Sequence, residues 1–147
     1  MNAKLNEFSA AMGLCNLKYI DKNIKKRERI VASYRKKLYN IKGLALNAIQ
    51  HEVEANYAYF PVLFEPRVFG ATRNEVMARL ESHNIFPRKY FYPLTNTFDA
   101  FHGKYDADQT PVALAVSKRV LTLPLYEDMK LADVDRVCKI VLSCQGR

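Results

Sequence analysis

The chain has 147 residues, of which 49% are hydrophobic and 12% aromatic, with only five glycines and six prolines and a net charge of +8. This composition excludes a disordered or low-complexity protein, and the length suits one ordinary folded domain. No apolar run approaches the roughly 20 residues that span a bilayer, and the start lacks a signal-peptide core, so we expect a cytoplasmic protein without membrane partners.

The first segment places two polar residues, Asn2 and Lys4, just ahead of a predicted helix whose opening carries Asn6 and Glu7. A helix start exposes unpaired N–H groups and the positive end of the helix dipole. An anion such as a phosphate would be held well there by an asparagine amide and a lysine ammonium. Lys4 is a poor candidate for a Schiff-base lysine, because such a lysine must be desolvated.

Apolar residues recur at intervals of three, four and seven from Leu5 to about Leu38, which predicts one long amphipathic helix or two joined near Tyr19 to Asn23. Gly43 is expected to supply the left-handed stop. A helix of this length rarely stands alone. We therefore expect it to bridge to another layer, either a further domain or a second subunit.

The positive charge is concentrated in residues 1–42, which hold 11 lysines and arginines against three acidic residues and so account for the whole net charge. The basic residues that recur at helical spacing are Lys18, Lys22, Lys25, Arg29 and Lys36. This stripe is typical of a solvated helix face. The alternative interpretation is a surface that attracts nucleic acid or another anion.

The aromatic and branched run from Tyr57 to Phe64 predicts a strand, and Pro61 within it indicates an edge strand or a bulge. Thr72 and Glu75 form a capping-box pattern that predicts a helix to about His83, and Asn84 is a plausible left-handed residue after it.

Residues 85–94 are expected to be extended and to feed a rigid loop, because Pro87 and Pro93 lie within the stretch on either side of residues 88–92. Within it, Arg88 beside Tyr90 and Tyr92 could hold a carboxylate or a phosphate in the bidentate manner of arginine, with the two phenols setting the orientation. The other interpretation is a surface arginine near buried aromatic residues. Residues 95–109 show no periodicity and predict a long surface loop.

The C-terminal part predicts three further elements. Thr110 and Pro111 mark the start of a short helix to about Arg119, residues 120–123 form a strand, and residues 132–143 form the last helix. The predicted strands are few, and they do not alternate regularly with helices. This pattern predicts an α+β fold, in which helices, including a long N-terminal one, pack on a small, mainly antiparallel sheet.

The three cysteines, Cys15, Cys138 and Cys144, are odd in number and widely spaced, so they support neither a disulfide framework nor a zinc site. Cys15 and Cys138 fall on apolar helix faces and are expected to be small core residues. The histidines are isolated from acidic or cysteine partners at ligand spacing. No metal site and no catalytic residue is predicted from these patterns.

Three stretches carry a resemblance to a known family. They are Asn-x-Lys-x-Asn-Glu-x-x-Ala-Ala-x-Gly-Leu at residues 2–14, the run around Arg88 at residues 84–94, and Leu-Thr-Leu-Pro-Leu-Tyr at residues 121–126. In this order they resemble the C-terminal part of the DegT/StrS family of sugar-nucleotide aminotransferases, which are fold-type I enzymes that use pyridoxal 5'-phosphate.

The resemblance implies that residues 1–147 form the small C-terminal domain. The large cofactor-binding domain, with the Schiff-base lysine, would lie before Met1, so the chain is expected to be a fragment. Asn2 matches an asparagine that reaches the phosphate of the neighbouring subunit's cofactor, and Lys4 stands where many members have arginine. Arg88 and Tyr90 match residues that face the sugar nucleotide or the amino donor.

The activity that the resemblance implies is transfer of an amino group, with glutamate as the expected donor, to a keto-sugar nucleotide by a homodimer. The isolated chain is expected to be inactive and to bind no cofactor tightly. Two alternatives remain at this stage. One is a stand-alone basic domain that binds nucleic acid or protein, and the other is a fragment of a related sugar dehydratase, whose distinguishing residue would lie in the large domain.

Overall fold

The computed structural model describes residues 4–101 and 103–146. Its sheet has three antiparallel strands in the order β1-β2-β3, formed by Leu44–Leu46, Phe60–Phe64 and Val120–Leu123. The α-helices are α1 (Glu7–Leu17), α2 (Ile20–Leu38), α3 (Pro66–Phe69), α4 (Arg73–Glu81), α5 (Pro111–Arg119) and α6 (Leu131–Ser143). The predicted α+β fold with a small antiparallel sheet is confirmed.

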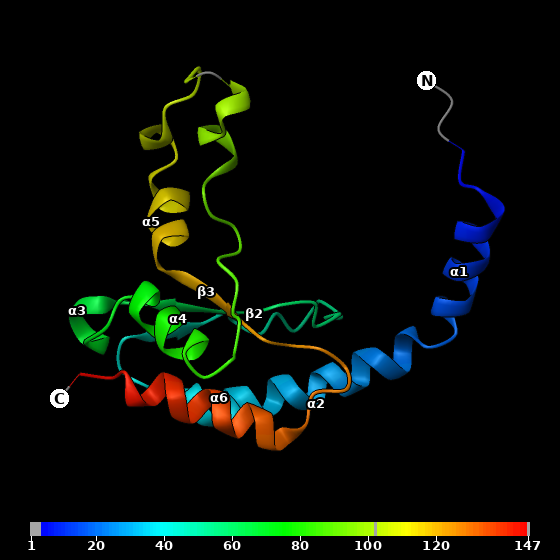
Figure 1. The fold of residues 1–147 in the computed structure, drawn as a ribbon, viewed down its shortest axis with the longest axis horizontal. Helices are drawn as coiled ribbons and strands as arrows, with labels where there is room; N and C mark the ends of the chain where they lie inside the picture. The colour runs from blue at the N-terminus through cyan, green and yellow to red at the C-terminus, as the bar shows by residue number, and fades with distance from the viewer. Residues whose placement is uncertain (1–3, 102, 147) are drawn as a thin grey trace.

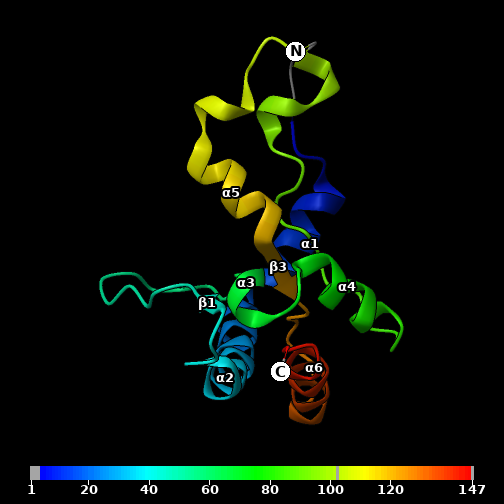
Figure 2. The ribbon, with the colours of Figure 1, turned by 90° about the vertical axis from the view of Figure 1, so that its left-hand side faces the viewer.

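The helices α2 and α6 lie side by side beneath one face of the sheet, while α5 and the segment before it rise from the opposite side (Figures 1 and 2). Fully buried apolar side chains from α2, α3, α4, α6 and the strands pack together into a core. The largest of them are Tyr34, Phe64, Phe69, Leu38, Leu80, Leu121 and Leu123. One contiguous core therefore holds the body of the chain together.

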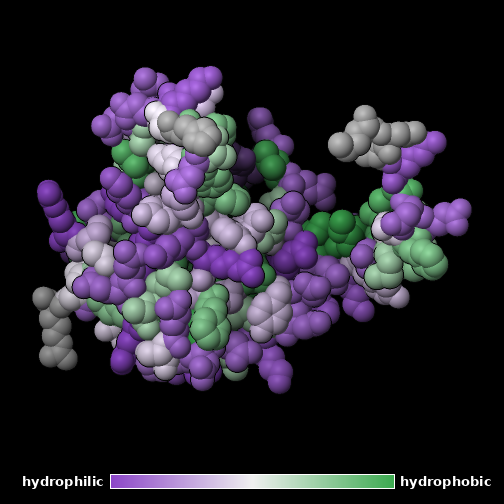
Figure 3. Space-filling view, turned by 45° about the horizontal axis from the view of Figure 1, so that its top comes forward, coloured by the Kyte–Doolittle hydropathy of each residue, from purple (hydrophilic) through white to green (hydrophobic). Residues whose placement is uncertain are grey.

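The predicted N-terminal helix is two helices, α1 and α2, that are separated by a turn at Lys18 and Tyr19. No residue of α1 is buried, and this helix projects from one end of the molecule (Figure 1). Figure 3 shows apolar side chains gathered over this projecting end. The expectation of a core position was wrong for Cys15, which is exposed, and correct for Cys138 on α6.

The helix α2 ends at Leu38, and Asn40 then adopts a left-handed conformation with φ of 62°. Gly43 is also left-handed, with φ of 82°, but it lies past the helix end and so is not the predicted stop. A Cβ atom at this glycine would lie 2.3 Å from the backbone nitrogen of Phe69. Gly43 is therefore needed where the backbone passes close to α3.

The strand β2 lies in the middle of the sheet, so the prediction of an edge strand at Pro61 was wrong. The pairing of β1 stops at Leu46, opposite Val62, whereas β3 pairs with Pro61 through Thr122. Pro61 thus lies beyond the last β1 pair, where one side of β2 has no ladder partner. The short strand β1 was not predicted.

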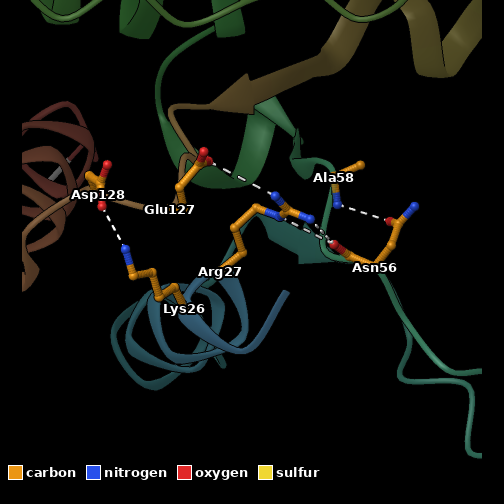
Figure 4. Close-up of polar contacts among 6 residues, drawn as sticks. All are labelled: Lys26, Arg27, Asn56, Ala58, Glu127 and Asp128. Atoms are coloured by element: carbon orange, nitrogen blue, oxygen red, sulfur yellow. Dashed lines mark hydrogen bonds and ion pairs between the residues drawn. The ribbon is translucent and has the colours of Figure 1, made fainter. Parts of the chain in front are cut away.

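Between β1 and β2 the chain forms an extended arm, residues 47–59, that projects from the sheet (Figure 1). Arg27 on α2 secures the base of this arm by donating from Nε and Nη2 to the backbone oxygen of Asn56, at 3.3 and 3.0 Å. On its other side, Arg27 faces Glu127, with a nitrogen–oxygen distance of 4.0 Å (Figure 4). One arginine therefore connects the arm, α2 and the segment before α6.

The capping box at Thr72 and Glu75 is confirmed, because the backbone nitrogen of Glu75 donates to the Thr72 hydroxyl and the Glu75 carboxylate accepts from the Thr72 backbone nitrogen. These bonds lower the pKa of Glu75. The left-handed conformation of Asn84 is confirmed as well, with φ of 58°. Local turn chemistry therefore fixes both ends of the α4 region.

The stretch before α5 is a loop with three short 3₁₀ turns, at Thr95–Thr97, Asp99–Phe101 and Ala107–Gln109. Its described residues are mostly exposed, as predicted for a surface loop. The helix α5 starts at Pro111 as predicted, but the Thr110 side chain does not cap it. That hydroxyl instead donates to the Ala107 carbonyl at 3.1 Å.

Candidate functional site

The backbone of Arg88 is anchored to β3. Its N–H donates to the carbonyl of Thr122 at 3.0 Å, and the Thr122 N–H donates back to the Arg88 carbonyl at 2.8 Å. This isolated antiparallel bridge extends the sheet by a single residue beyond β3. Arg88 is thus positioned by the most buried strand of the fold, whose four residues are all buried.

The predicted partners Arg88 and Tyr90 lie together. Arg88 Nη1 donates to the phenol oxygen of Tyr90, and the guanidinium carbon lies 5.5 Å from the centroid of the same ring. The bond to Tyr90 raises the pKa of Arg88. Because Arg88 is exposed, its permanently charged fork is accessible to a carboxylate or a phosphate.

Two further aromatic rings flank Tyr90, and sequence reasoning did not identify them as parts of the site. Tyr59 meets Tyr90 edge-on, with centroids 5.3 Å apart at 85°, and Phe91 stacks on it at 5.1 Å and 19°. Phe91 is 70% exposed and Tyr59 55% exposed. The only signal for Tyr59 was its place in an aromatic run, which predicts a strand rather than a site.

A buried arginine supports the next residue of the segment. Arg73 is 4% exposed and donates from Nη1 to the carbonyls of Ser117 and Val120, both at 2.9 Å. Its guanidinium carbon also lies 4.8 Å from the ring centroid of Tyr92. Burial lowers the pKa of Arg73. This residue therefore ties α4 and the end of α5 to the aromatic segment.

The predicted cofactor contacts lie elsewhere in the chain. Lys4 is exposed and precedes Asn6, whose side chain caps α1 by accepting from the Ser9 backbone nitrogen at 2.8 Å. Asn2 lies outside the described residues. Helix α1 projects from one end of the molecule, apart from the segment after α4 that includes residues 85–94 (Figure 1).

All five residues of the predicted basic stripe are exposed, namely Lys18, Lys22, Lys25, Arg29 and Lys36. Other cations of α2 are paired with acidic residues at or before α6. Lys26 lies 2.7 Å from Asp128 (Figure 4), and Lys37 lies 2.9 Å from Asp135. The exposed stripe is thus distinct from the two α2 lysines, Lys26 and Lys37, that pair with acidic residues at or before α6.

In the described part of the chain, no three histidine, cysteine or acidic side chains gather in a way that could hold a metal ion. The helices among these residues are also too short or too polar to cross a membrane. What the described residues do offer is one exposed arginine that is backed by aromatic rings and anchored to the sheet.

The sequence profile of the DegT/DnrJ/EryC1/StrS aminotransferase family matches residues 1–142. The chain belongs to this family. The match includes the start of α1, the segment with Arg88 and the strand β3, which are the three stretches that carried the resemblance in the sequence. Membership therefore rests on nearly the whole chain rather than on an isolated motif.

Relatives within this aminotransferase family are longer than the chain. A dTDP-4-amino-4,6-dideoxy-D-glucose transaminase of Escherichia coli is 35% identical over 145 residues, which cover 97% of this chain and 39% of the relative. The spore coat polysaccharide biosynthesis protein SpsC of Bacillus subtilis strain 168 is 32% identical over 143 residues, 94% of this chain and 36% of that protein. The chain thus spans little more than a third of their length.

A solved structure of another protein shares the fold. DesI, determined in the presence of its TDP-sugar product, superposes with a TM-score of 0.90 at 28% identity, covering 98% of this chain and 36% of that one. The agreement includes nearly all of the described chain. It confirms the small-sheet fold that the family resemblance implied.

Proposed function

We propose that residues 1–147 form the small C-terminal domain of a sugar-nucleotide aminotransferase. The intact enzyme would transfer an amino group, with glutamate as donor, to a keto-sugar nucleotide in cell-surface polysaccharide or deoxyamino-sugar biosynthesis in the cytoplasm. Family membership over residues 1–142 carries this proposal. The transaminase of E. coli and the polysaccharide protein of B. subtilis, as their names describe them, support the reaction and its setting.

In this proposal Arg88 and Tyr90 contribute to the substrate site. Arg88 is exposed, its main chain is fixed by Thr122 and its side chain is bonded to Tyr90. An arginine held in this way presents its remaining N–H groups to an anion without first having to be ordered. Both proposed substrates carry such an anion, the diphosphate of the sugar nucleotide or a carboxylate of glutamate.

The cofactor of the intact enzyme would be pyridoxal 5'-phosphate, which acts as an electron sink in amino transfer. Lys4, exposed ahead of the first turn of α1, fits a contact to its phosphate, and Asn2 is proposed beside it. A Schiff-base lysine has to be desolvated, whereas none of the lysines in residues 4–101 and 103–146 is buried. We therefore expect the chain alone to be inactive and to bind the cofactor weakly.

The intact enzyme is proposed to be a homodimer. The helix α1 supports this, because it is apolar on several sides and yet exposed, with Phe8 at 87% and Met12 at 63%. A helix that is hydrophobic all round is normally enclosed by other structure. In a dimer, this helix would carry Lys4 to the neighbouring subunit, since it projects from one end of its own chain (Figure 1).

A chimera tests the proposed function. Residues 1–142 would replace the matching segment of the E. coli transaminase, and 2-oxoglutarate release from glutamate would be measured with a dTDP-linked 4-keto sugar. We expect turnover by the chimera and none by the 147-residue chain. In the chimera, Arg88→Gln should raise the KM for the keto-sugar nucleotide or for glutamate, whichever places its anion at Arg88, about tenfold or more. The control Arg67→Gln, at an exposed arginine on α3, should leave both KM values unchanged.

The outcome that contradicts the proposal is a folded chimera that releases no 2-oxoglutarate with any keto-sugar nucleotide. Turnover by the isolated chain would contradict only its expected inactivity. An unchanged KM in the Arg88→Gln chimera would remove this arginine from the substrate site while leaving the reaction in place.

A further inference from the structure

Tyr90 is held between two aromatic rings that come from different parts of the fold. Phe91 is its neighbour in the chain and stacks on its face, whereas Tyr59 immediately precedes β2 and meets it edge-on. Edge-to-face and offset-stacked rings attract each other through their quadrupoles. The position of the Tyr90 ring is therefore set by the residue that precedes the central strand as well as by its own loop.

The side chain of Arg88 depends on this arrangement. Its main chain is fixed by the bridge to Thr122, but its guanidinium is held, among the contacts of the described residues, by the Tyr90 phenol and ring alone. A shift of Tyr90 would therefore release the guanidinium while leaving the Arg88 backbone in place. Tyr59 is the contact that connects Tyr90 to the main sheet.

We propose that Tyr59 is a positioning residue for the substrate site. It holds Tyr90, and through it orients the Arg88 fork toward an anionic group of the ligand. The exposed surfaces of Tyr59 and Phe91 would cover the apolar part of that ligand next to the anion. The inference rests on the proposed function in taking the anion to be the diphosphate of the sugar nucleotide or the carboxylate of the amino donor.

Binding to the 147-residue chain tests this proposal without any turnover. Isotope-labelled chain would be titrated with thymidine diphosphate in one series and glutamate in another, while the Arg88 Nε–H signal is followed by NMR. A saturable shift with thymidine diphosphate assigns the anion to the nucleotide, and one with glutamate assigns it to the donor. Either result agrees with an anion site at Arg88.

Three variants examine the role of Tyr59. Tyr59→Leu should weaken binding about fivefold, because it removes the aromatic contact to Tyr90. Tyr59→Phe keeps the ring edge and should bind within about twofold of the original chain. Tyr39→Leu is the matched control, since Tyr39 is 66% exposed and lies at the end of α2. Unchanged signals from core methyl groups would show that each variant is folded.

The proposal is overturned if neither ligand shifts the Arg88 signal in a saturable way. It is also overturned if Tyr59→Leu binds as tightly as the original chain, or if Tyr59→Phe binds as weakly as Tyr59→Leu. Phe91→Leu, which removes the other ring, provides a second variant and should weaken binding to a similar degree. The chimera assay is independent of these titrations. If the chimera is active but Tyr59→Leu does not weaken binding, this inference fails and the proposed function stands.

Discussion

The hydroxyl of Tyr34 donates a hydrogen bond of 2.9 Å to the backbone oxygen of Pro124, a residue 90 positions further along the chain. Tyr34 is fully buried on α2, and its ring stacks on Phe60 with centroids 4.8 Å apart. One side chain thus connects α2, the start of β2 and the end of β3. This bond fixes the backbone just after β3, where the chain leads toward α6.

Tyr34→Phe should lower the free energy of unfolding by roughly 1–2 kcal/mol, because it leaves the Pro124 carbonyl without its donor while retaining the ring. Urea unfolding measured by circular dichroism would show this as a lower midpoint with an unchanged slope. Tyr39→Phe, at the exposed residue that directly follows the same helix, is the control and should change the midpoint little. Equal midpoints for the two variants would contradict this role of the hydrogen bond.

Cys138 should make the fold sensitive to alkaline pH. Burial raises the pKa of this thiol from its ordinary 9.0 to about 12. The unfolded chain therefore releases the proton near pH 9, whereas the folded chain retains it, so stability is lost progressively as the pH rises from about 9 toward 12. Cys138→Ala should show a shallower loss of urea midpoint between pH 8 and 10.5 than the original chain.

Cys15→Ala is the matched control for this pH series, because Cys15 is exposed and its replacement should leave the slope as it is. A slope that is the same in all three chains would contradict the assignment to Cys138.

The same two cysteines should differ in reactivity toward a thiol reagent. Cys15 is exposed on α1, while Cys138 is 2% exposed within the core. Ellman's reagent at pH 8 should therefore modify Cys15 rapidly and Cys138 only after denaturant is added. Mass spectrometry of the labelled peptides identifies the site, and rapid labelling of Cys138 in the native chain would show that α6 is not packed as described.

Arg73→Lys should destabilise the chain by roughly 2 kcal/mol. The guanidinium donates from Nη1 to the carbonyls of Ser117 and Val120 and from Nε to Asn74 Oδ1 at the same time, which a single ammonium group cannot do. Thermal unfolding would give the change in midpoint. Arg79→Lys on the exposed side of the same helix is the control. A loss no larger than that of the control would mean that water replaces the missing donors.

Thr72→Ala should cost about 1 kcal/mol, the typical value for an N-cap residue. Thr110→Ala is the informative comparison, since Thr110 holds the same N-cap position before α5 but makes no capping bond to it. Urea titration of both variants measures the difference. A larger loss at Thr110 would show that the loop bond to Ala107 stabilises the fold more than the capping box does.

Local chemistry explains what could be predicted from the sequence. The capping box at Thr72, the left-handed Asn84 and the break before Pro111 each depend on residues within one turn of the chain, and each is present in the structure. The pairing of Arg88 with Tyr90 was predictable for the same reason, because the two residues are only two positions apart.

Contacts between distant segments could not be predicted in this way. Tyr59 meets Tyr90 only because β2 and the segment after Arg88 come together in the fold. Cys15 was wrongly expected in the core for another reason. Apolar periodicity predicts which face of a helix is apolar, but not whether other structure covers that face. The position of β2 at the centre of the sheet depended on β1, which has only three residues.

The projecting helix α1 has a consequence for how assembly could be followed in solution. An eleven-residue helix with no buried residue is marginal in water, so its amide hydrogens should exchange quickly while those of α2 are protected by the core. Docking of α1 against any other surface would slow that exchange without affecting the body. The exchange rate of residues 7–17 therefore reports, independently of the rest of the chain, whether α1 is docked against another surface.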